Sequence, residues 1–479
     1  MSRPNILWIV TDQQRWDTLG CYGNPFVLTP NLDRLAGSGV RFDHAYCQNP
    51  VCTPSRAALM TGRYPRTTRC RQNGQMIPAG EVLVTRLLAR HGYKCGLVGK
   101  LHLAPVHPNY FPEGEHRVKD GFEEWRWSAG PGHGMADGYT HWLHLRDLEY
   151  KRTPFAGSKY VQTSMPVEHH QTTWCAERTM RFITEHAIGD SPWLCFCGIF
   201  DPHHPFDPPE EYLRRYVDRL KDLPLPSYTP GELDDKPLFQ QLDHRAAYNV
   251  PGLYPFDQMS DDDHRLVRAA YWAMVGLIDF QVGRILQTLR ETGQLDNTLV
   301  VFTSDHGELL GDHGIYCKGP HFYEPSIRVP LVVSCPRRMA GNRASPALVE
   351  LVDLAPTLLE AAGLQRHPGM QGRSLWPMLT GGAPLESHRD DIYSEFYNSG
   401  HSHTDPQAHA TMVRTATHKL VVQHGQEVGE LYDLQNDPGE TRNLWNDPAA
   451  AAVKIEMLKR LTDRMAWTVD PLPPRLAPW

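Results

Sequence analysis

Hydrophobic positions up to about residue 334 form short continuous runs, separated by segments of helical periodicity. A continuous apolar run predicts a strand that is buried on both faces, because a half-exposed strand would alternate apolar and polar positions. Strands are predicted on this basis at residues 5–11, 93–98, 193–200, 298–303 and 331–334. The helical segments predict two short helices, at residues 32–38 and 82–91, and a long one at residues 261–292.

The long predicted helix begins with three aspartates, whose charge is favourable at the positive N-terminus of a helix, and it ends at Gly293. Strands and helices thus alternate along this part of the chain. The alternation predicts an α/β fold with a large, mostly parallel central sheet and helices on both faces.

Two long segments, 104–170 and 201–260, lack periodicity and are rich in proline, glycine, histidine and aromatic residues. Loops of this length in an enzyme usually build a pocket. They therefore predict where the larger part of a substrate would be held.

The pattern changes after about residue 365. Residues 412–422 and 430–434 predict antiparallel strands, and residues 448–467 predict a closing helix. We therefore expect a catalytic α/β domain at 1–365 and a smaller C-terminal subdomain, with an antiparallel sheet, at 366–479.

Composition and charge narrow the class of protein. Of the 479 residues, 41% are hydrophobic and 22% are charged, which is ordinary for a soluble globular protein. A net charge of −7 argues against nucleic acid as a partner, so an anionic substrate would need a local positive site. No apolar run reaches the roughly 18 residues that span a bilayer, so we expect no membrane segment.

Two further features bear on the compartment. The chain enters a strand almost at once, which predicts a cytoplasmic protein, or a periplasmic one if an export signal was removed. Its ten cysteines show no close pair with zinc-finger spacing and predict free thiols rather than a disulfide framework.

One cysteine lies in a string that suits anion chemistry. In Cys52-Thr53-Pro54-Ser55-Arg56, Thr53 is a plausible N-cap and Pro54 suits the first helical position, so we expect a helix that ends at Gly62. Cys52 would then lie just before a helix N-terminus, where free N–H groups stabilise negative charge, and Arg56 would add a cation one turn further on. On these residues alone, a buried thiol followed by a structural arginine is an equally good interpretation.

Polar side chains that suit a hard cation follow two of the predicted strands. Asp12 and Gln13 come directly after the first strand, and Asp305 and His306 follow the strand at 298–303. Functional groups in open α/β sheets gather at the carboxyl ends of strands, so we expect these side chains to meet. Oxygen-rich ligands of this kind suit a divalent cation, although Asp12 alone could be a turn or helix cap.

Cationic and imidazole groups follow other strand ends. Lys100 and His102 come after the strand at 93–98, and His203 follows the strand at 193–200. Lys100 would neutralise an oxygen of an anionic ester, and His102 could accept a proton from a hydroxyl group. Taken alone, a lysine and a histidine in a loop are more often solvated surface residues.

Together, these strings resemble the motifs of the sulfatase family. The match runs through Cys-x-Pro-Ser-Arg and its extension to Arg63, through Thr11-Asp12-Gln13-Gln14, through Ser304-Asp305-His306-Gly307, through Pro-His-x-Pro-Phe at His203, and through the segment that ends in Lys318-Gly319. The motifs occur in the family's order, and the resemblance covers residues 3–447. It implies an alkaline-phosphatase-like α/β sandwich and the conversion of Cys52 to formylglycine by a separate generating enzyme.

The resemblance also implies roles for individual residues. One divalent metal would be held by Asp12, Gln13, the modified Cys52, Asp305 and His306. We expect Ca²⁺, with Mn²⁺ or Mg²⁺ as alternatives, because a histidine ligand makes calcium less secure. The modified Cys52 would also be the nucleophile. The other catalytic residues, around the ester and its leaving group, would be Arg56, Lys100, His102, His203 and Lys318.

The expected activity is the hydrolysis of a sulfate monoester. Asp12-Gln13 departs from the Asp-Asp of many sulfatases, and with His306 it resembles phosphonate monoester hydrolases, so hydrolysis of a phosphonate monoester or phosphodiester is the alternative. A non-catalytic anion-binding protein on the same fold is a remote third reading, which predicts an unmodified Cys52 and no turnover.

The alcohol part of the substrate is less clear from the sequence. The two long loop segments and the segment with His401 and His403 are expected to shape its pocket, and their composition suits a sugar and an aryl group equally. The substrate would thus be a small-molecule or saccharide sulfate ester. The proline-rich tail at 470–479 leaves room for contacts within a homo-oligomer.

Overall fold

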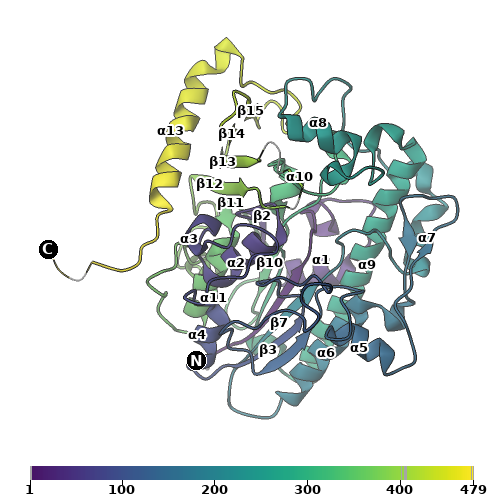
Figure 1. Cartoon of the computed structure of the whole chain (residues 1–479). Helices are drawn as coiled ribbons and strands as arrows, with labels where there is room; N and C mark the ends of the chain where they lie inside the picture. Colours follow the sequence, from purple (N-terminus) through teal and green to yellow (C-terminus); the bar gives the residue numbers. More distant parts are fainter. Residues whose placement is uncertain (1–2, 401, 404–406, 476, 478–479) are drawn as a thin grey trace.

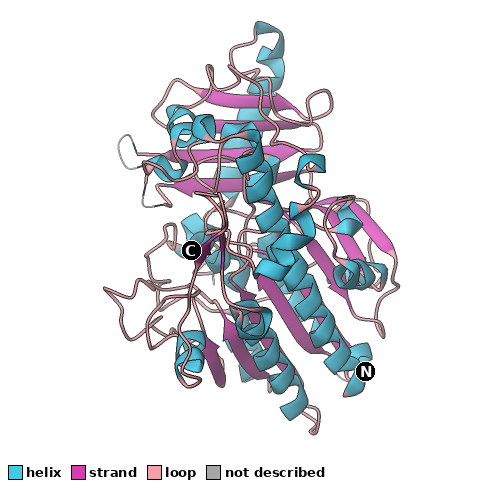
Figure 2. Cartoon of the chain, turned by 90° about the vertical axis from the view of Figure 1, so that its right-hand side faces the viewer, coloured by secondary structure: helices cyan, strands magenta, loops and turns pink. Residues whose placement is uncertain are grey.

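The chain folds around two sheets, a larger one and a smaller one that lies above it in Figure 2. The computed structural model describes residues 3–400, 402–403, 407–475 and 477. His401, which the sequence placed near the substrate, lies outside the described residues, as do three residues of the C-terminal tail.

The central sheet has nine strands in the order β11-β2-β10-β8-β1-β7-β3-β4, with β9 paired to β2. Its strands are β1 (Asn5–Thr11), β2 (Val40–Tyr46), β3 (Lys94–Gly99), β4 (Glu124–Trp127), β7 (Trp193–Ile199), β8 (Thr298–Ser304), β9 (Arg328–Val329), β10 (Leu331–Ser334) and β11 (Arg343–Glu350). Most pairs are parallel, and β9 and β10 run antiparallel to their neighbours. The α/β class is confirmed, and the five predicted strands match to within one residue at each end.

Helices cover both faces of this sheet. In β1, Ile6 and Trp8 belong to one hydrophobic core and Leu7 and Ile9 to the other, which explains why the strand is apolar throughout. One face is covered by α1 (Pro30–Gly37), α6 (Gln171–Glu185) and α9 (Asp261–Glu291), and the other by α2 (Cys52–Thr61), α4 (Val84–Arg90) and α11 (Leu354–Ala361). The predicted long helix is α9, and a capping box at Ser260 begins it.

The second sheet has four antiparallel strands in sequence order: β12 (Asp391–Tyr397), β13 (His409–Thr415), β14 (His418–Gln423) and β15 (Gly429–Asp433). The single strand predicted at 412–422 is wrong, since a turn between β13 and β14 divides it. The expected closing helix is α13 (Ala451–Trp467), which packs against this sheet along the left of Figure 1.

The two segments without periodicity contain only short elements. They hold α5 (Gly138–His144), β5 (Thr153–Pro154), β6 (Gln162–Thr163), α7 (Glu210–Val217) and α8 (Leu238–Arg245). Within the described part of the chain, no helix is both long enough and apolar enough to cross a membrane.

Glu350, at the end of β11, joins the two sheets. Its carboxylate accepts a hydrogen bond from the backbone N–H of Tyr393 in β12 at 2.8 Å and forms an ion pair with Arg464 of α13 at 2.6 Å. Arg389 lies 3.3 Å away on the same carboxylate, and Glu350 itself is 1% exposed. A buried charge with these partners ties the C-terminal part to the catalytic core.

We expect Glu350→Gln to lower the free energy of unfolding by about 3 kcal/mol, because it removes a buried carboxylate that Arg389 and Arg464 share. Urea denaturation measures the change. Glu360→Gln, at an exposed position on α11, is the matched control and should change stability little. Equal effects of the two substitutions would contradict this role for Glu350.

Candidate active site

The ends of four central strands bring the predicted polar residues to one edge of the sheet. Thr11 of β1 pairs with Ile199 of β7 and with Ser304 of β8, and Gly99 of β3 pairs with Gly198. Because these strands are parallel and end in register, the residues that follow each of them emerge side by side. Asp12, Lys100, His203 and Asp305 all follow such an end.

Helix α2 presents Cys52 to this edge. The helix begins at Cys52 itself, not after it, and Val51 is the N-cap residue. The expected cap by Thr53 is wrong: its hydroxyl has no hydrogen-bond partner within the described part of the chain, and its backbone N–H donates to Asn73 Oδ1 at 2.9 Å. Gly62 ends the helix in the left-handed conformation, as predicted, with φ of 66°.

A buried arginine holds two carboxylates from different strands. Arg56 Nε lies 2.6 Å from Asp305 Oδ2, and its Nη2 lies 3.5 Å from Asp12 Oδ2. Its Nη1 also donates to the backbone carbonyl of Lys100 at 2.8 Å, and the Lys100 ammonium forms a close ion pair with Asp12. Arg56 and both carboxylates are fully buried, so these charges stabilise one another away from solvent.

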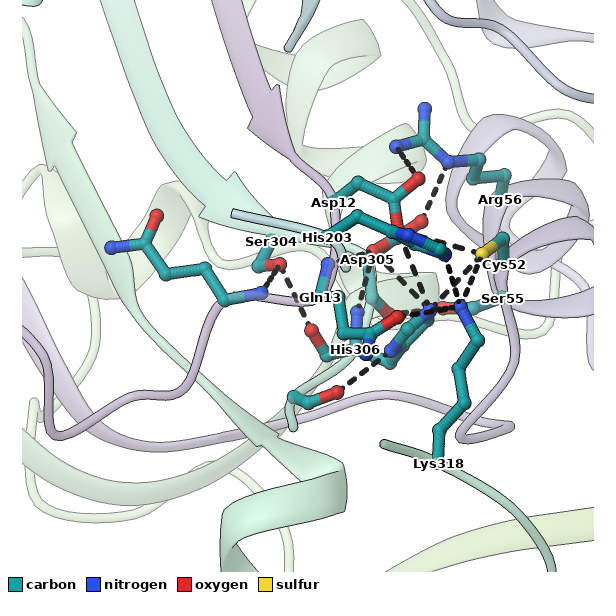
Figure 3. A network of polar contacts seen from close by, with 12 residues as sticks. Asp12, Gln13, Cys52, Ser55, Arg56, His203, Ser304, Asp305, His306 and Lys318 are labelled. Carbon is teal, nitrogen blue, oxygen red and sulfur yellow. Dashed lines mark hydrogen bonds and ion pairs between the residues drawn. The ribbon is translucent and has the colours of Figure 1, made fainter. Parts of the chain in front are cut away.

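Lys318 reaches into the centre of the cluster (Figure 3). Its ammonium lies 2.7 Å from Gln13 Oε1, 3.1 Å from Cys52 Sγ and 2.9 Å from His203 Nε2. His306 Nε2 is 3.4 Å away. The ammonium thus occupies a position that oxygen, sulfur and nitrogen lone pairs surround, as they would surround a metal ion.

The donor set around this position fits a divalent cation. Asp12, Cys52, Asp305 and His306 each offer a ligand atom within 4.8 Å of the others, and all four are buried. His306 Nδ1 lies 2.9 Å from a backbone carbonyl, so it donates there, and the deprotonated Nε2 would offer its lone pair to a cation in the cluster. The Gln13 amide oxygen faces the same point.

The same charges set the ionisation of the site. Burial by itself raises the pKa of the Cys52 thiol, but Lys100, Lys318 and His306 outweigh it and hold that pKa well below its usual range. Burial and the charge of Lys100 lower the pKa of His102 to about 4, so this imidazole is neutral at neutral pH. Burial and Lys318 likewise lower the pKa of His203.

A cavity of about 210 Å³ opens onto the cluster. Its lining includes Lys318 and His203 from the catalytic core and Phe396, Gly400 and His403 from the C-terminal part. It is smaller than the roughly 300 Å³ lower limit of sites for drug-sized ligands, and so suits a single ring or a short chain.

Several neighbours were not assigned from sequence. Ser55 Oγ donates to the Asp305 backbone carbonyl at 2.5 Å, and Glu308 makes a close contact with the Gln13 amide. His204, which follows His203 in the sequence, lines the cavity with its Nδ1 3.2 Å from Gln13 Nε2. The adjacency of Glu308 to the Asp305-His306-Gly307 string was the one sequence signal that could have identified it.

We expect Arg56→Met to lower the free energy of unfolding by about 3 kcal/mol or more, because two buried carboxylates lose their shared cation. Arg34→Met, an exposed arginine on α1, is the matched control. Urea denaturation of both variants decides the point, and comparable losses would show that Arg56 carries no special electrostatic role.

Comparison with known proteins agrees with this geometry. The family model described as Sulfatase matches residues 4–364, and the model described as N-sulphoglucosamine sulphohydrolase, C-terminal, matches residues 311–466. The uncharacterized sulfatase YidJ of Escherichia coli (strain K12) is 30% identical, over 98% of this chain and 89% of its own.

Two further proteins extend the comparison. An N-acetylglucosamine-6-O-sulfatase of Bacteroides thetaiotaomicron is 28% identical, over 96% of this chain and 86% of its own. The crystal structure of a phosphonate monoester hydrolase of Agrobacterium radiobacter superposes with a TM-score of 0.85 at 28% identity, covering 98% of this chain and 97% of that one. With a family model that matches most of its length, the chain belongs to the sulfatase family of enzymes.

Proposed function

We propose that this enzyme hydrolyses a sulfate monoester of an aryl or carbohydrate alcohol, with a nucleophile made from Cys52. The observation that carries the proposal is the position of Cys52, as the first residue of α2 and within 3.1 Å of the Lys318 ammonium. A helix N-terminus and three buried cations there favour the binding of an anionic group. The sulfatase relatives and family model support the same reaction class.

The proposed nucleophile is formylglycine, formed from Cys52 by a formylglycine-generating enzyme; the hydrate of this aldehyde supplies the attacking oxygen. The charges of the site favour such a change. Leaving His306 and a bound metal ion aside, a Cys52 thiolate together with Asp12 and Asp305 would match the three cations Arg56, Lys100 and Lys318 in charge. A neutral side chain leaves an excess of positive charge, which an incoming sulfate ester compensates.

The metal would be held by Asp12, Gln13, Asp305 and His306 together with the modified residue. We assign Ca²⁺, with Mn²⁺ or Mg²⁺ as alternatives. When bound, such an ion supplies charge stabilisation to the oxygens at the reacting centre. Arg56 fixes the two carboxylates so that their remaining oxygens stay available.

The surrounding side chains bind the ester and move protons. Lys100 and Lys318 offset the charge that develops on the non-bridging oxygens. His203, 2.9 Å from Lys318, is placed to deliver a proton with it to the departing alcohol oxygen. His102 is neutral at neutral pH and can take a proton from the nucleophile's hydroxyl when sulfate leaves.

A second candidate is hydrolysis of a phosphonate monoester or phosphodiester at the same site. Gln13 favours it, since its amide oxygen occupies a position where a second aspartate would add negative charge. The structural similarity to phosphonate monoester hydrolases supports it as well. Sulfate monoesters and these phosphorus esters are both monoanions, so the charge of the site does not favour one substrate class over the other.

Mass spectrometry of the Cys52 peptide, from protein made with the generating enzyme, should show sulfur replaced by oxygen and two hydrogens lost. Cys52→Ala should abolish turnover of 4-nitrophenyl sulfate, because no nucleophile remains. Cys47→Ala, at a buried cysteine outside the cluster, is the control and should retain activity.

An intact thiol with activity that survives Cys52→Ala would refute the mechanism. Faster turnover of a phosphodiester or phenylphosphonate ester than of the matched sulfate would favour the second candidate. No turnover of any ester by the modified protein would leave only anion binding.

Chelation should abolish activity, and stoichiometric Ca²⁺ should restore it. Asp305→Asn should raise the Ca²⁺ concentration needed for half-maximal reactivation at least tenfold, because one anionic ligand is lost. Asp296→Asn, remote from the cluster, is the matched control. Reactivation by Mn²⁺ but not by Ca²⁺ would identify manganese as the metal. Full activity of the metal-free protein would show that no metal takes part in the reaction.

A further inference from the structure

One buried carboxylate binds the turn that carries His102. Glu115 Oε2 accepts a hydrogen bond from the backbone N–H of His102 at 2.9 Å, and its Oε1 accepts from the N–H groups of Leu103 at 2.5 Å and Ala104 at 3.2 Å. The indole Nε1 of Trp127 also donates to Oε2, at 2.7 Å. Glu115 is 7% exposed, so four donors converge on an anion that is largely removed from solvent.

His102 has an unusual backbone conformation, and this carboxylate accounts for it. The φ angle of 61° lies in the left-handed region, which is unfavourable for a residue with a side chain. Such a conformation persists only where its surroundings hold it. Turns of this kind direct successive N–H groups at an anion, as those of residues 102, 103 and 104 are directed at Glu115. The carboxylate therefore compensates the strain at His102.

The interaction requires a negative charge on Glu115. Burial raises the pKa of Glu115, and its hydrogen bonds from the backbone and from Trp127 act against that rise. An ionised carboxylate accepts on both oxygens, whereas a glutamine amide accepts on one atom and donates from the other. An amide at this position would thus place its own N–H groups against two of the four donors.

The turn lies next to the reacting centre. The His102 ring is near enough to Cys52 that each side chain shifts the pKa of the other. The Leu103 carbonyl separately accepts a hydrogen bond from the Ile77 N–H at 2.8 Å, so the loop has a second anchor. Loss of the carboxylate should therefore loosen the turn at His102 without releasing the whole loop.

We propose that Glu115 is a positioning residue that keeps the His102 ring at Cys52 for the step in which sulfate leaves. The proposal rests on the proposed function. In that step His102 takes the proton from the free hydroxyl of the nucleophile, the electrons of that O–H bond form the C=O bond, and the C–O bond to sulfate breaks. A ring that moves with its turn slows this step and leaves the earlier attack on the ester unaffected.

Steady-state kinetics with 4-nitrophenyl sulfate distinguish this role from a general structural one. In Glu115→Gln, kcat and KM should fall together, roughly tenfold or more, because sulfate departure becomes slow. Their ratio kcat/KM should stay within about twofold, since it reports only the steps up to the attack on sulfur. Release of 4-nitrophenol should begin with a burst that is stoichiometric with the enzyme.

Asp137→Asn is the matched control. Asp137 is also a fully buried carboxylate that accepts from backbone N–H groups, those of Ala129 at 2.9 Å and Tyr139 at 3.0 Å, but these residues have no part in the candidate site. The control should lower stability and leave kcat, KM and the time course unchanged. Combining Glu115→Gln with His102→Asn should slow turnover no more than His102→Asn alone, because the first substitution acts through the second residue.

Trp127→Phe removes a single donor and decides the point if Glu115→Gln does not fold. It should lower kcat and KM together by a smaller factor, and Trp125→Phe, in the same strand, should not. Unchanged kinetics in Glu115→Gln, a kcat/KM that falls as much as kcat, or losses that add in the double variant would overturn the proposal.

A crystal structure of the unmodified Glu115→Gln protein tests the positioning without any turnover. His102 should leave the left-handed region, and its ring should move away from Cys52. If this shift is seen while the wild-type protein hydrolyses no ester, the proposed function fails and the dependence of His102 on Glu115 stands. A ring that has not moved contradicts the proposal, whatever the kinetics.

Discussion

The guanidinium of Arg56 lies between Asp12 and Asp305, and the placing of the other reactive groups depends on this contact. Each carboxylate follows a different strand of the central sheet, and without a shared cation two buried anions so close together would repel each other. Arg56 also holds the backbone of Lys100, so one side chain fixes three strand ends relative to α2. The first residue of that helix, Cys52, is thereby held at the same point.

The smaller sheet completes the cavity above this centre. Glu350 connects β11 to β12 and α13, and Lys419 of β14 forms ion pairs with Glu440 at 2.6 Å and with Glu324 of the catalytic core at 3.0 Å. Phe396 and His403 therefore face Lys318 and His203 across a fixed gap. The catalytic core supplies the charges, and the residues that line the cavity come from both parts.

The sequence predicted those parts of the fold whose signal is local. Strands buried on both faces, such as β1, are apolar throughout, and α9 carries its own capping residue and closing glycine. β2 and β12 went unrecognised because polar residues interrupt their apolar pattern. In β2, Arg41, Asp43 and His44 are half-buried, and in β12 the buried Glu395 carboxylate accepts a hydrogen bond from the backbone N–H of Arg66.

The residues of the candidate site also differ in how far the sequence alone could identify them. Cys52, Asp12 and Asp305 lie in strings that are recognisable by themselves, and the structure brings them together. Glu115 lies in no such string, because the backbone N–H groups that it binds are 11 to 13 positions away and meet it only in the folded chain. Likewise, the backbone N–H of Thr53, in the first turn of α2, donates to Asn73 Oδ1, a partner that only the three-dimensional path of the chain brings to the helix.

All ten residues of α2 are buried, and Cys52 is 1% exposed. On the proposed mechanism a second protein modifies this side chain, and it could not reach Cys52 once the helix is packed around Arg56. Modification and folding are then in kinetic competition during synthesis. On that proposal, a chain that folds first would keep its thiol, buried beside Lys318, and the yield of working enzyme would depend on the ratio of two rates rather than on stability.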